Sequence, residues 1–260
     1  MVILSNCVFG DKNERREFKI SKESYLGFLG FNKHGTPFKV VEYKNTNSLI
    51  IEFQDEYKYR TKSTVQNVMR GQIKNPYDKI IYGIAYIGDG QYKSVIEDNA
   101  NNPMYINWRN MLKRCYCPKF QKDNPTYIGC TVVSEWHNYQ NYGKWHDDNY
   151  YDVGDGRMHL DKDILIRGNK LYSPETCIYV PQRINMLFME KRRKSEFPTG
   201  ILKRSNKYCA MYNTEYLGLF DTIDEAQEEH MKAKRLHIKR VADEYKSKIP
   251  ERLYNALYEW

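Results

Sequence analysis

The chain has 260 residues, of which 28% are charged and 41% hydrophobic, and its formal net charge is +8. No apolar run reaches the ~20 residues that cross a bilayer, and the short apolar start lacks a basic segment before it, so we expect neither a membrane span nor a signal peptide. The basic balance favours a polyanionic partner, with nucleic acid first.

Six cysteines occur without a Cys-x-x-Cys pair, which predicts reduced thiols in a cytoplasmic protein. The residues that could gather around zinc are Cys115, Cys117, Cys130, Cys177 and His137. Their spacing matches no standard zinc knuckle, so we favour buried core cysteines and expect no zinc.

Residues 1–82 predict a small β-rich module. Segments 38–43 and 49–53 are rich in strand-forming residues, and the turn cluster at 44–48 makes them a hairpin. A third strand is expected over 57–62. A DNA-contacting accessory and a module that docks a protein partner are equally open interpretations.

Residues 83–104 have a linker-like composition of Gly, Asn and acidic residues. A helix follows, with an apolar stripe at helical spacing formed by Trp108, Met111, Leu112 and Cys115. The basic residues Arg109, Lys113 and Arg114 lie off that stripe, where a solvated face is more common than a phosphate-binding one.

A second helix is expected from a cap at Ser134. Its aromatic residues Trp136, Tyr139, Tyr142 and Trp145 recur every third position, which indicates core packing rather than a base-stacking platform. His137 and His146 are weak site candidates for that reason.

Near the C-terminus, residues 199–234 predict three short strands and a helix that begins with a Thr222–Glu225 capping box. Leu217-Gly218, Phe220-Asp221-Thr222 and Glu225-Ala226 are the most diagnostic marks. This segment resembles the Apetala-type DNA-binding domain of plant ethylene-response factors.

The resemblance implies that the sheet enters the major groove of double-stranded DNA. The residues expected to face DNA are Arg204, Lys207, Asn213 and Tyr216, with Lys203 beside them and the basic run Lys191, Arg192, Arg193 and Lys194 before them. Tyr208, Ala210 and Tyr212 alternate with them and should pack on the helix. Leu202 and Met211 stand where the plant domains carry charges, so backbone anchoring is expected more than sharp sequence reading.

The central stretch LDKDILIRGNKLYSPETCIYVPQRIN covers residues 160–185 and resembles the core of phage-type HNH homing endonucleases. The resemblance implies two strands and a helix that hold one divalent ion. Asp161 falls on the carboxylate ligand and Asn185 on the amide ligand, and their oxygens suit Mg²⁺ or Mn²⁺.

Two positions depart from that pattern. Lys162 stands where the family has its catalytic histidine, and Thr176 stands where it has the asparagine that orients the histidine. His159 shares a strand face with Asp161 and could replace the missing base. Lys162 is the other candidate for that base. Asp163 shares the same face and could add a metal ligand. The alternative is that both aspartates form a polar turn and Asn185 only ends a helix.

The sequence therefore predicts an α+β protein: a β-rich module at 1–82, a linker at 83–104, an HNH-like ββα-metal region at 105–190, and an Apetala-like module at 191–260. The expected function is a Mg²⁺-dependent DNA endonuclease of phage or mobile-element type, acting in the bacterial cytoplasm. A non-cleaving DNA-binding regulator is the first alternative, and a protein-binding inhibitor that docks through the β module is the second.

Overall fold

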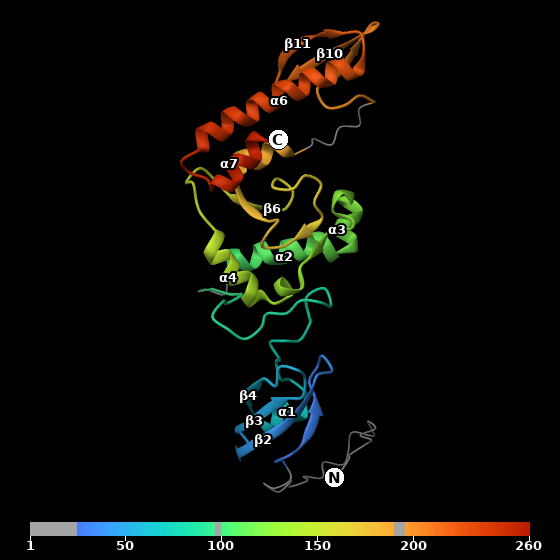
Figure 1. The fold of residues 1–260 in the computed structure, drawn as a ribbon. Helices are drawn as coiled ribbons and strands as arrows, with labels where there is room; N and C mark the ends of the chain where they lie inside the picture. Colours follow the sequence, from blue (N-terminus) through green and yellow to red (C-terminus); the bar gives the residue numbers. More distant parts are fainter. Residues whose placement is uncertain (1–24, 97–99, 190–195) are drawn as a thin grey trace. The chain divides into compact units, whose positions relative to one another are not determined.

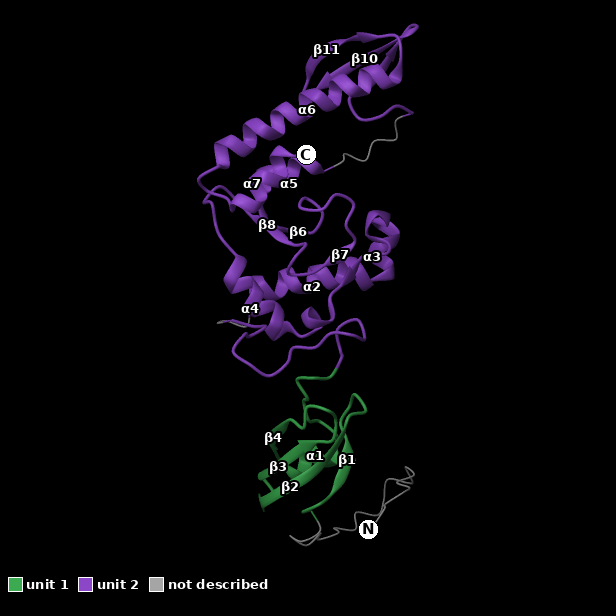
Figure 2. Ribbon diagram, viewed as in Figure 1, with its two compact units in different colours: residues 1–78 green, residues 79–260 purple. Residues whose placement is uncertain are grey.

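The computed structural model describes residues 25–96, 100–189 and 196–260. They form an α+β fold, as the sequence predicts, and the chain divides into two compact units, residues 1–78 and 79–260 (Figures 1 and 2). Within the described residues, no helix is both long and apolar enough to cross a membrane.

The first unit contains a four-stranded antiparallel sheet in the order β1-β2-β3-β4, followed by a short helix. The elements are β1 (Leu29–Phe31), β2 (Pro37–Asn45), β3 (Ser48–Phe53), β4 (Arg60–Ser63) and α1 (Val65–Met69). Leu49, Ile51 and Phe53 alternate into the core of this unit, which confirms the predicted hairpin. Strand β1 was not predicted, because three residues are too few to show an alternating pattern.

Polar side chains close the first unit near its C-terminal end. Asp78 accepts a hydrogen bond from the buried amide of Asn32 at 2.7 Å and another from the hydroxyl of Thr36. Asn75 donates to Asp55 at 2.6 Å. A buried amide is costly unless it is paired, so these bonds attach residues 75–78 to the sheet.

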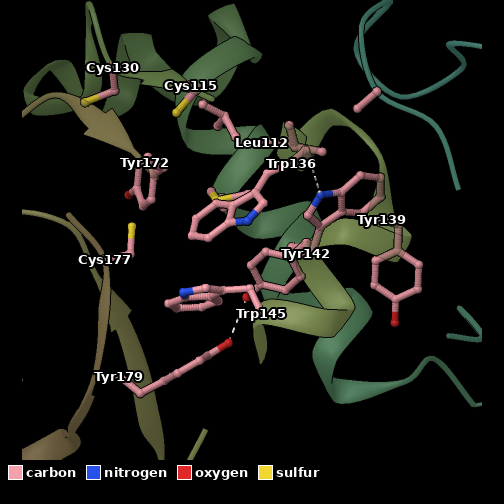
Figure 3. Packing of buried hydrophobic residues seen from close by; sticks show 14 of the residues in the cluster. Leu112, Cys115, Cys130, Trp136, Tyr139, Tyr142, Trp145, Tyr172, Cys177 and Tyr179 are labelled. Atoms are coloured by element: carbon pink, nitrogen blue, oxygen red, sulfur yellow. Dashed lines mark hydrogen bonds between the residues drawn. The ribbon is translucent and has the colours of Figure 1, made fainter. Parts of the chain in front are cut away.

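The second unit is built around an aromatic core (Figure 3). The core takes side chains from α2 (Pro103–Tyr116), η4 (Ser134–His137), α4 (Tyr139–Asn149), β5 (Thr131–Val132), β7 (Leu171–Tyr172) and β8 (Ile178–Pro181). The indole N–H of Trp108 donates to the carbonyl of Trp136 at 2.7 Å, and the hydroxyls of Tyr142 and Tyr179 are 2.8 Å apart. Both predicted apolar stripes are buried here, which confirms their core assignment. The short helix α3 (Pro118–Asp123) and the turn η3 (Pro125–Tyr127) follow α2.

Two local expectations change in this region. The backbone of Tyr86 bonds the carbonyl of His137 and the N–H of Tyr139, so the chain near residue 86 packs on the core instead of forming a free linker, and Ala85 is fully buried. The same pairing interrupts the predicted helix. Helix α4 therefore begins after Asn138, whose side chain caps it, and Ser134 is not the cap.

Strand β6 (Met158–Asp161) pairs antiparallel with β8, and α5 (Gln182–Phe188) follows β8 directly. Between β6 and β8, the chain adds β7, which pairs parallel with β5. The result is a ββα arrangement at residues 158–188.

The C-terminal sheet has the order β11-β10-β9 and is formed by β9 (Ile201–Arg204), β10 (Lys207–Tyr212) and β11 (Glu215–Phe220). Helix α6 (Ile223–Tyr245) begins with the predicted capping box and packs on this sheet through Ala226. Its C-terminal half joins a second core with α7 (Glu251–Tyr258), α5 and β8. One continuous helix thus contacts both the sheet and the ββα arrangement (Figure 1).

Candidate functional site

The register of the β6–β8 hairpin determines which side chains share a face. His159 lies opposite Val180, and Asp161 lies opposite Ile178. Cross-strand partners point to the same side of an antiparallel pair, and Ile178 and Val180 pack with Ile184 of α5. His159 and Asp161 are therefore on the face that α5 covers.

Asn185 follows Ile184 on α5 and is half-buried. The two residues that the HNH resemblance pairs as metal ligands thus lie on the two elements that pack together here. This agrees with the expected layout, although the helix is only seven residues long.

The Asp161 carboxylate ends β6. Its Oδ1 accepts the backbone N–H groups of Asp163 and Ile164, both at 2.8 Å. Burial, and then the nearby charge of Asp163, raise the pKa of Asp161 to about 6. A half-buried carboxylate whose charge is disfavoured by its surroundings is stabilised by a cation, so Asp161 fits a divalent ion.

Asp163 does not share the β6 face as the sequence suggested, because the strand ends at Asp161 and the chain bends there. Its side chain is exposed and pairs with the ammonium of Lys162 at 2.9 Å. The polar-turn interpretation therefore holds locally for this pair, since Oδ1 of Asp161 accepts the two N–H groups of the turn.

Lys162 is buried, so its side chain is not placed to bind a phosphate. Its ammonium donates to the carbonyl of Asn169 at 2.8 Å, and Asn169 bonds back to the carbonyl of Lys162. Thr176, at the orienting position, donates to the carbonyl of Leu171 at 2.7 Å. Both replacements hold the loop between β6 and β8, so neither is placed to activate water.

His159 remains as the candidate base. Burial, together with the charges of Arg114 and Arg157, lowers its pKa, so the imidazole is neutral at pH 7. Its Nε2 is one of the buried polar atoms without a hydrogen-bond partner in the described part of the chain. A neutral imidazole with a free nitrogen can accept a proton.

Arg114 is a residue that the sequence reasoning missed. It extends from α2, is half-buried, bonds the hydroxyl of Tyr172 and lies over the ring of Tyr127 at 5.6 Å. Burial opposes its charge, but Tyr172, Tyr127 and Asp161 outweigh that effect and raise its pKa. Its charge also acts on His159. Only the packing of α2 could reveal that Arg114 acts on His159 and Asp161, because in the sequence it is simply one of the three basic residues of this helix, with Arg109 and Lys113.

Three of the cysteines considered for zinc, Cys115, Cys130 and Cys177, lie in the aromatic core, and Cys117 is half-buried. Cys115, Cys130 and Cys177 are buried and free, and burial raises the pKa of both Cys115 and Cys177 to about 12. Over the described ranges, no three His, Cys, Asp or Glu side chains are grouped as metal ligands. A divalent ion at Asp161 would thus need the Asn185 amide, substrate oxygens or water to complete its shell.

On the C-terminal sheet, the register divides the predicted DNA-facing residues. Arg204 pairs with Lys207, and Tyr216 pairs with Met211, on the face opposite α6. Lys203 instead pairs with Tyr208, on the helix side, and Asn213 lies in the β10–β11 turn at 3.2 Å from His237. The expectation that Tyr208, Ala210 and Tyr212 pack on α6 is confirmed.

The open face of this sheet is part basic and part apolar. Leu202 and Leu219 are each 46% exposed on either side of the buried Cys209, and Lys207 forms an ion pair with Asp221 at 2.9 Å. The predicted basic run Lys191–Lys194 lies outside the described residues.

Comparison with known protein families, with curated proteins and with solved structures finds no match for this chain.

Proposed function

We propose that this protein is a DNA endonuclease that depends on Mg²⁺ or Mn²⁺ and acts in the cytoplasm of a bacterial host. The observation that carries the proposal is the ββα arrangement, in which α5 bears Asn185 and covers the β6 face that bears His159 and Asp161. The HNH resemblance supplies the chemistry, and the C-terminal sheet supplies an Apetala-like surface for duplex DNA.

Asp161 and Asn185 would hold the divalent ion, which would stabilise the negative charge on a phosphate oxygen and on the leaving group. His159 accepts the proton of the attacking water at its free Nε2. Arg114 adds positive charge beside the same strand, where it can bind a phosphate. Lys162 keeps the loop in place through the Asn169 carbonyl.

The test is a nicking assay on supercoiled DNA with Mg²⁺ or Mn²⁺, with a chelator as control. Asp161→Asn should abolish cleavage while DNA binding persists, and His159→Ala should slow it by roughly 10²–10⁴. Lys162→Met should leave the rate per folded molecule unchanged. If the wild-type protein cleaves no DNA with either metal, the endonuclease proposal is wrong.

A non-cleaving DNA-binding regulator is the second candidate. It is favoured by the engagement of Asp161 Oδ1 in a turn and by the burial of Lys162 at the usual base position. In that case Asp161→Asn would change neither DNA affinity nor any cleavage rate, because no cleavage would occur.

A protein-docking role for the first unit is a further candidate. Leu29 and Phe31 are each 68% exposed on the edge strand β1, and Met69 of α1 is 55% exposed. Exposed large apolar side chains on a small unit are a feature of interaction surfaces. The role predicts that Phe31→Ser weakens protein association, measured by light scattering and by capture of a binding partner, with no effect on DNA affinity.

A further inference from the structure

The second unit has an open pocket of about 200 Å³ beside α2 that the proposed active site does not use. The residues that line it are Tyr82, Asn101, Tyr105, Ile106, Arg109, Asn110 and Lys113. They combine two cations, two phenol rings and two amides with the aliphatic side chain of Ile106.

The cations lie on one face of α2. Arg109 and Lys113 are four residues apart, so they are neighbours on the helix surface, and both are exposed. Helix α2 contains no acidic residue, and no ion pair within the described ranges involves either side chain. Arg109 lies over the ring of Tyr105 at 5.7 Å and Lys113 over the ring of Phe120 at 5.2 Å, so each cation contacts a ring and not a carboxylate, and its exposed charge can meet an anion.

The rings are held in position. Tyr105 packs against Trp108 at 5.8 Å and against Tyr139 at 5.4 Å between ring centroids, so one of its faces is supported by the core. Tyr82 is 37% exposed and adopts a left-handed backbone with φ of +52°, next to Gly83 with φ of +72°. This conformation is unfavourable for a bulky residue, whereas glycine adopts it without strain.

We propose that this pocket binds one nucleotide of a single nucleic-acid strand. Arg109 and Lys113 hold the phosphate, and the base lies on the ring of Tyr82, with Asn101 and Asn110 at its polar edge. Base stacking on an aromatic ring together with a basic track is the common design of single-strand sites. The volume is below the ~300–1,000 Å³ of drug-sized sites, which suits one unit of a passing strand.

The source of the strand, DNA held at the nuclease site, is the part of this inference that rests on the proposed function. Helix α2 supports this link, since it carries Arg114 toward β6 and carries Arg109 and Lys113 into the pocket. A strand that leaves the site can follow this helix.

The experiment measures binding of the full chain to fluorescent oligothymidine of about 15 nucleotides by anisotropy, over a range of salt. Tyr82→Gly removes the ring and keeps the left-handed backbone, and it should weaken binding by about 5- to 150-fold. Arg109→Gln with Lys113→Gln should reduce the salt slope by about 0.7, the contribution of the one phosphate that is no longer neutralised. Tyr82→Phe should bind like the wild type, which separates ring loss from misfolding.

Lys119→Gln with Lys122→Gln is the matched control, because it removes two exposed charges from α3 outside the pocket. The pocket is ruled out if this control weakens binding as much as the α2 pair does, if Tyr82→Gly has no effect, or if the wild type does not bind the oligomer. Failure of the endonuclease proposal would look different: duplex cleavage would be absent while the Tyr82 and Arg109 effects on single strands remained.

Discussion

Oδ1 of Asp161 accepts the backbone N–H of Ile164 at 2.8 Å, and this bond turns the chain at the end of β6. The same carboxyl group has its pKa raised to about 6 by burial and by Asp163. At neutral pH the folded protein therefore carries a charge that its surroundings disfavour, at the position where a divalent ion would stabilise it.

Removing that charge should stabilise the protein. Because the pKa of Asp161 is about 6 in the folded state against 3.8 ordinarily, the folded state binds more protons between these values, and the free energy of unfolding falls as pH rises through this window. Asp161→Asn cannot titrate but can still accept the N–H of Ile164. It should match the wild-type Tm near pH 4 and exceed it above pH 6 by calorimetry. An equal difference in Tm at both pH values would contradict this.

A divalent ion should stabilise the wild-type protein. Ligands that bind only the folded state raise its stability by RT ln(1 + [L]/Kd), so millimolar Mg²⁺ or Mn²⁺ should raise Tm. The increase should vanish in Asp161→Asn and persist in Asp148→Asn, which changes an exposed aspartate on α4. The measurement is thermal unfolding with and without metal, and loss of the shift in both variants would point to nonspecific binding.

Arg114→Gln should impair cleavage more than DNA binding. Its guanidinium bonds Tyr172 and acts on Asp161 and His159, so its loss removes one charged donor beside the reacting phosphate. We expect a decrease in kcat of about 10²–10³ with little change in KM. Arg114→Lys keeps the charge and should recover part of the rate. An equal loss in both variants would indicate that the planar hydrogen bond to Tyr172 is the essential feature.

Asp221→Asn should tighten duplex binding. Asp221 pairs with Lys207 at 2.9 Å on an exposed surface, and it competes with phosphate for that ammonium. Arg204→Ala should weaken binding by about 1–3 kcal/mol if it contacts guanine. Lys203→Ala is the control, because its register places it on the helix side of the sheet. If Lys203→Ala weakens binding more than Arg204→Ala, the open face does not enter the groove.

Asp78→Ala should destabilise the first unit alone. It removes the partners of Thr36 and of the buried Asn32, and an unsatisfied buried amide costs about 1–3 kcal/mol. Calorimetry should show one transition moving to lower temperature while the transition of residues 79–260 stays unchanged. A joint shift of both transitions would show that the two units unfold together.

The local patterns in this sequence were sufficient for several elements. The stripe from Trp108 to Cys115, the aromatic stripe from Trp136 to Trp145, the β2–β3 hairpin and the Thr222 cap all follow from periodicity or capping chemistry within a few residues. Ser134 was wrong as a cap, because the backbone of Tyr86 bonds residues 137 and 139 and only the fold brings these segments together.

The sequence by itself determined the α+β class and the core stripes, because these depend on spacing of 2.0 or 3.6 residues, and the HNH resemblance supplied the choice of Asp161 and Asn185. Only the tertiary structure decided that Lys162 is buried against the Asn169 carbonyl, that the charge of Arg114 acts on Asp161 and His159, and that Lys203 is on the α6 side of its sheet. Burial, charge proximity and strand register arise between segments far apart in the chain, and therefore no local pattern encodes them.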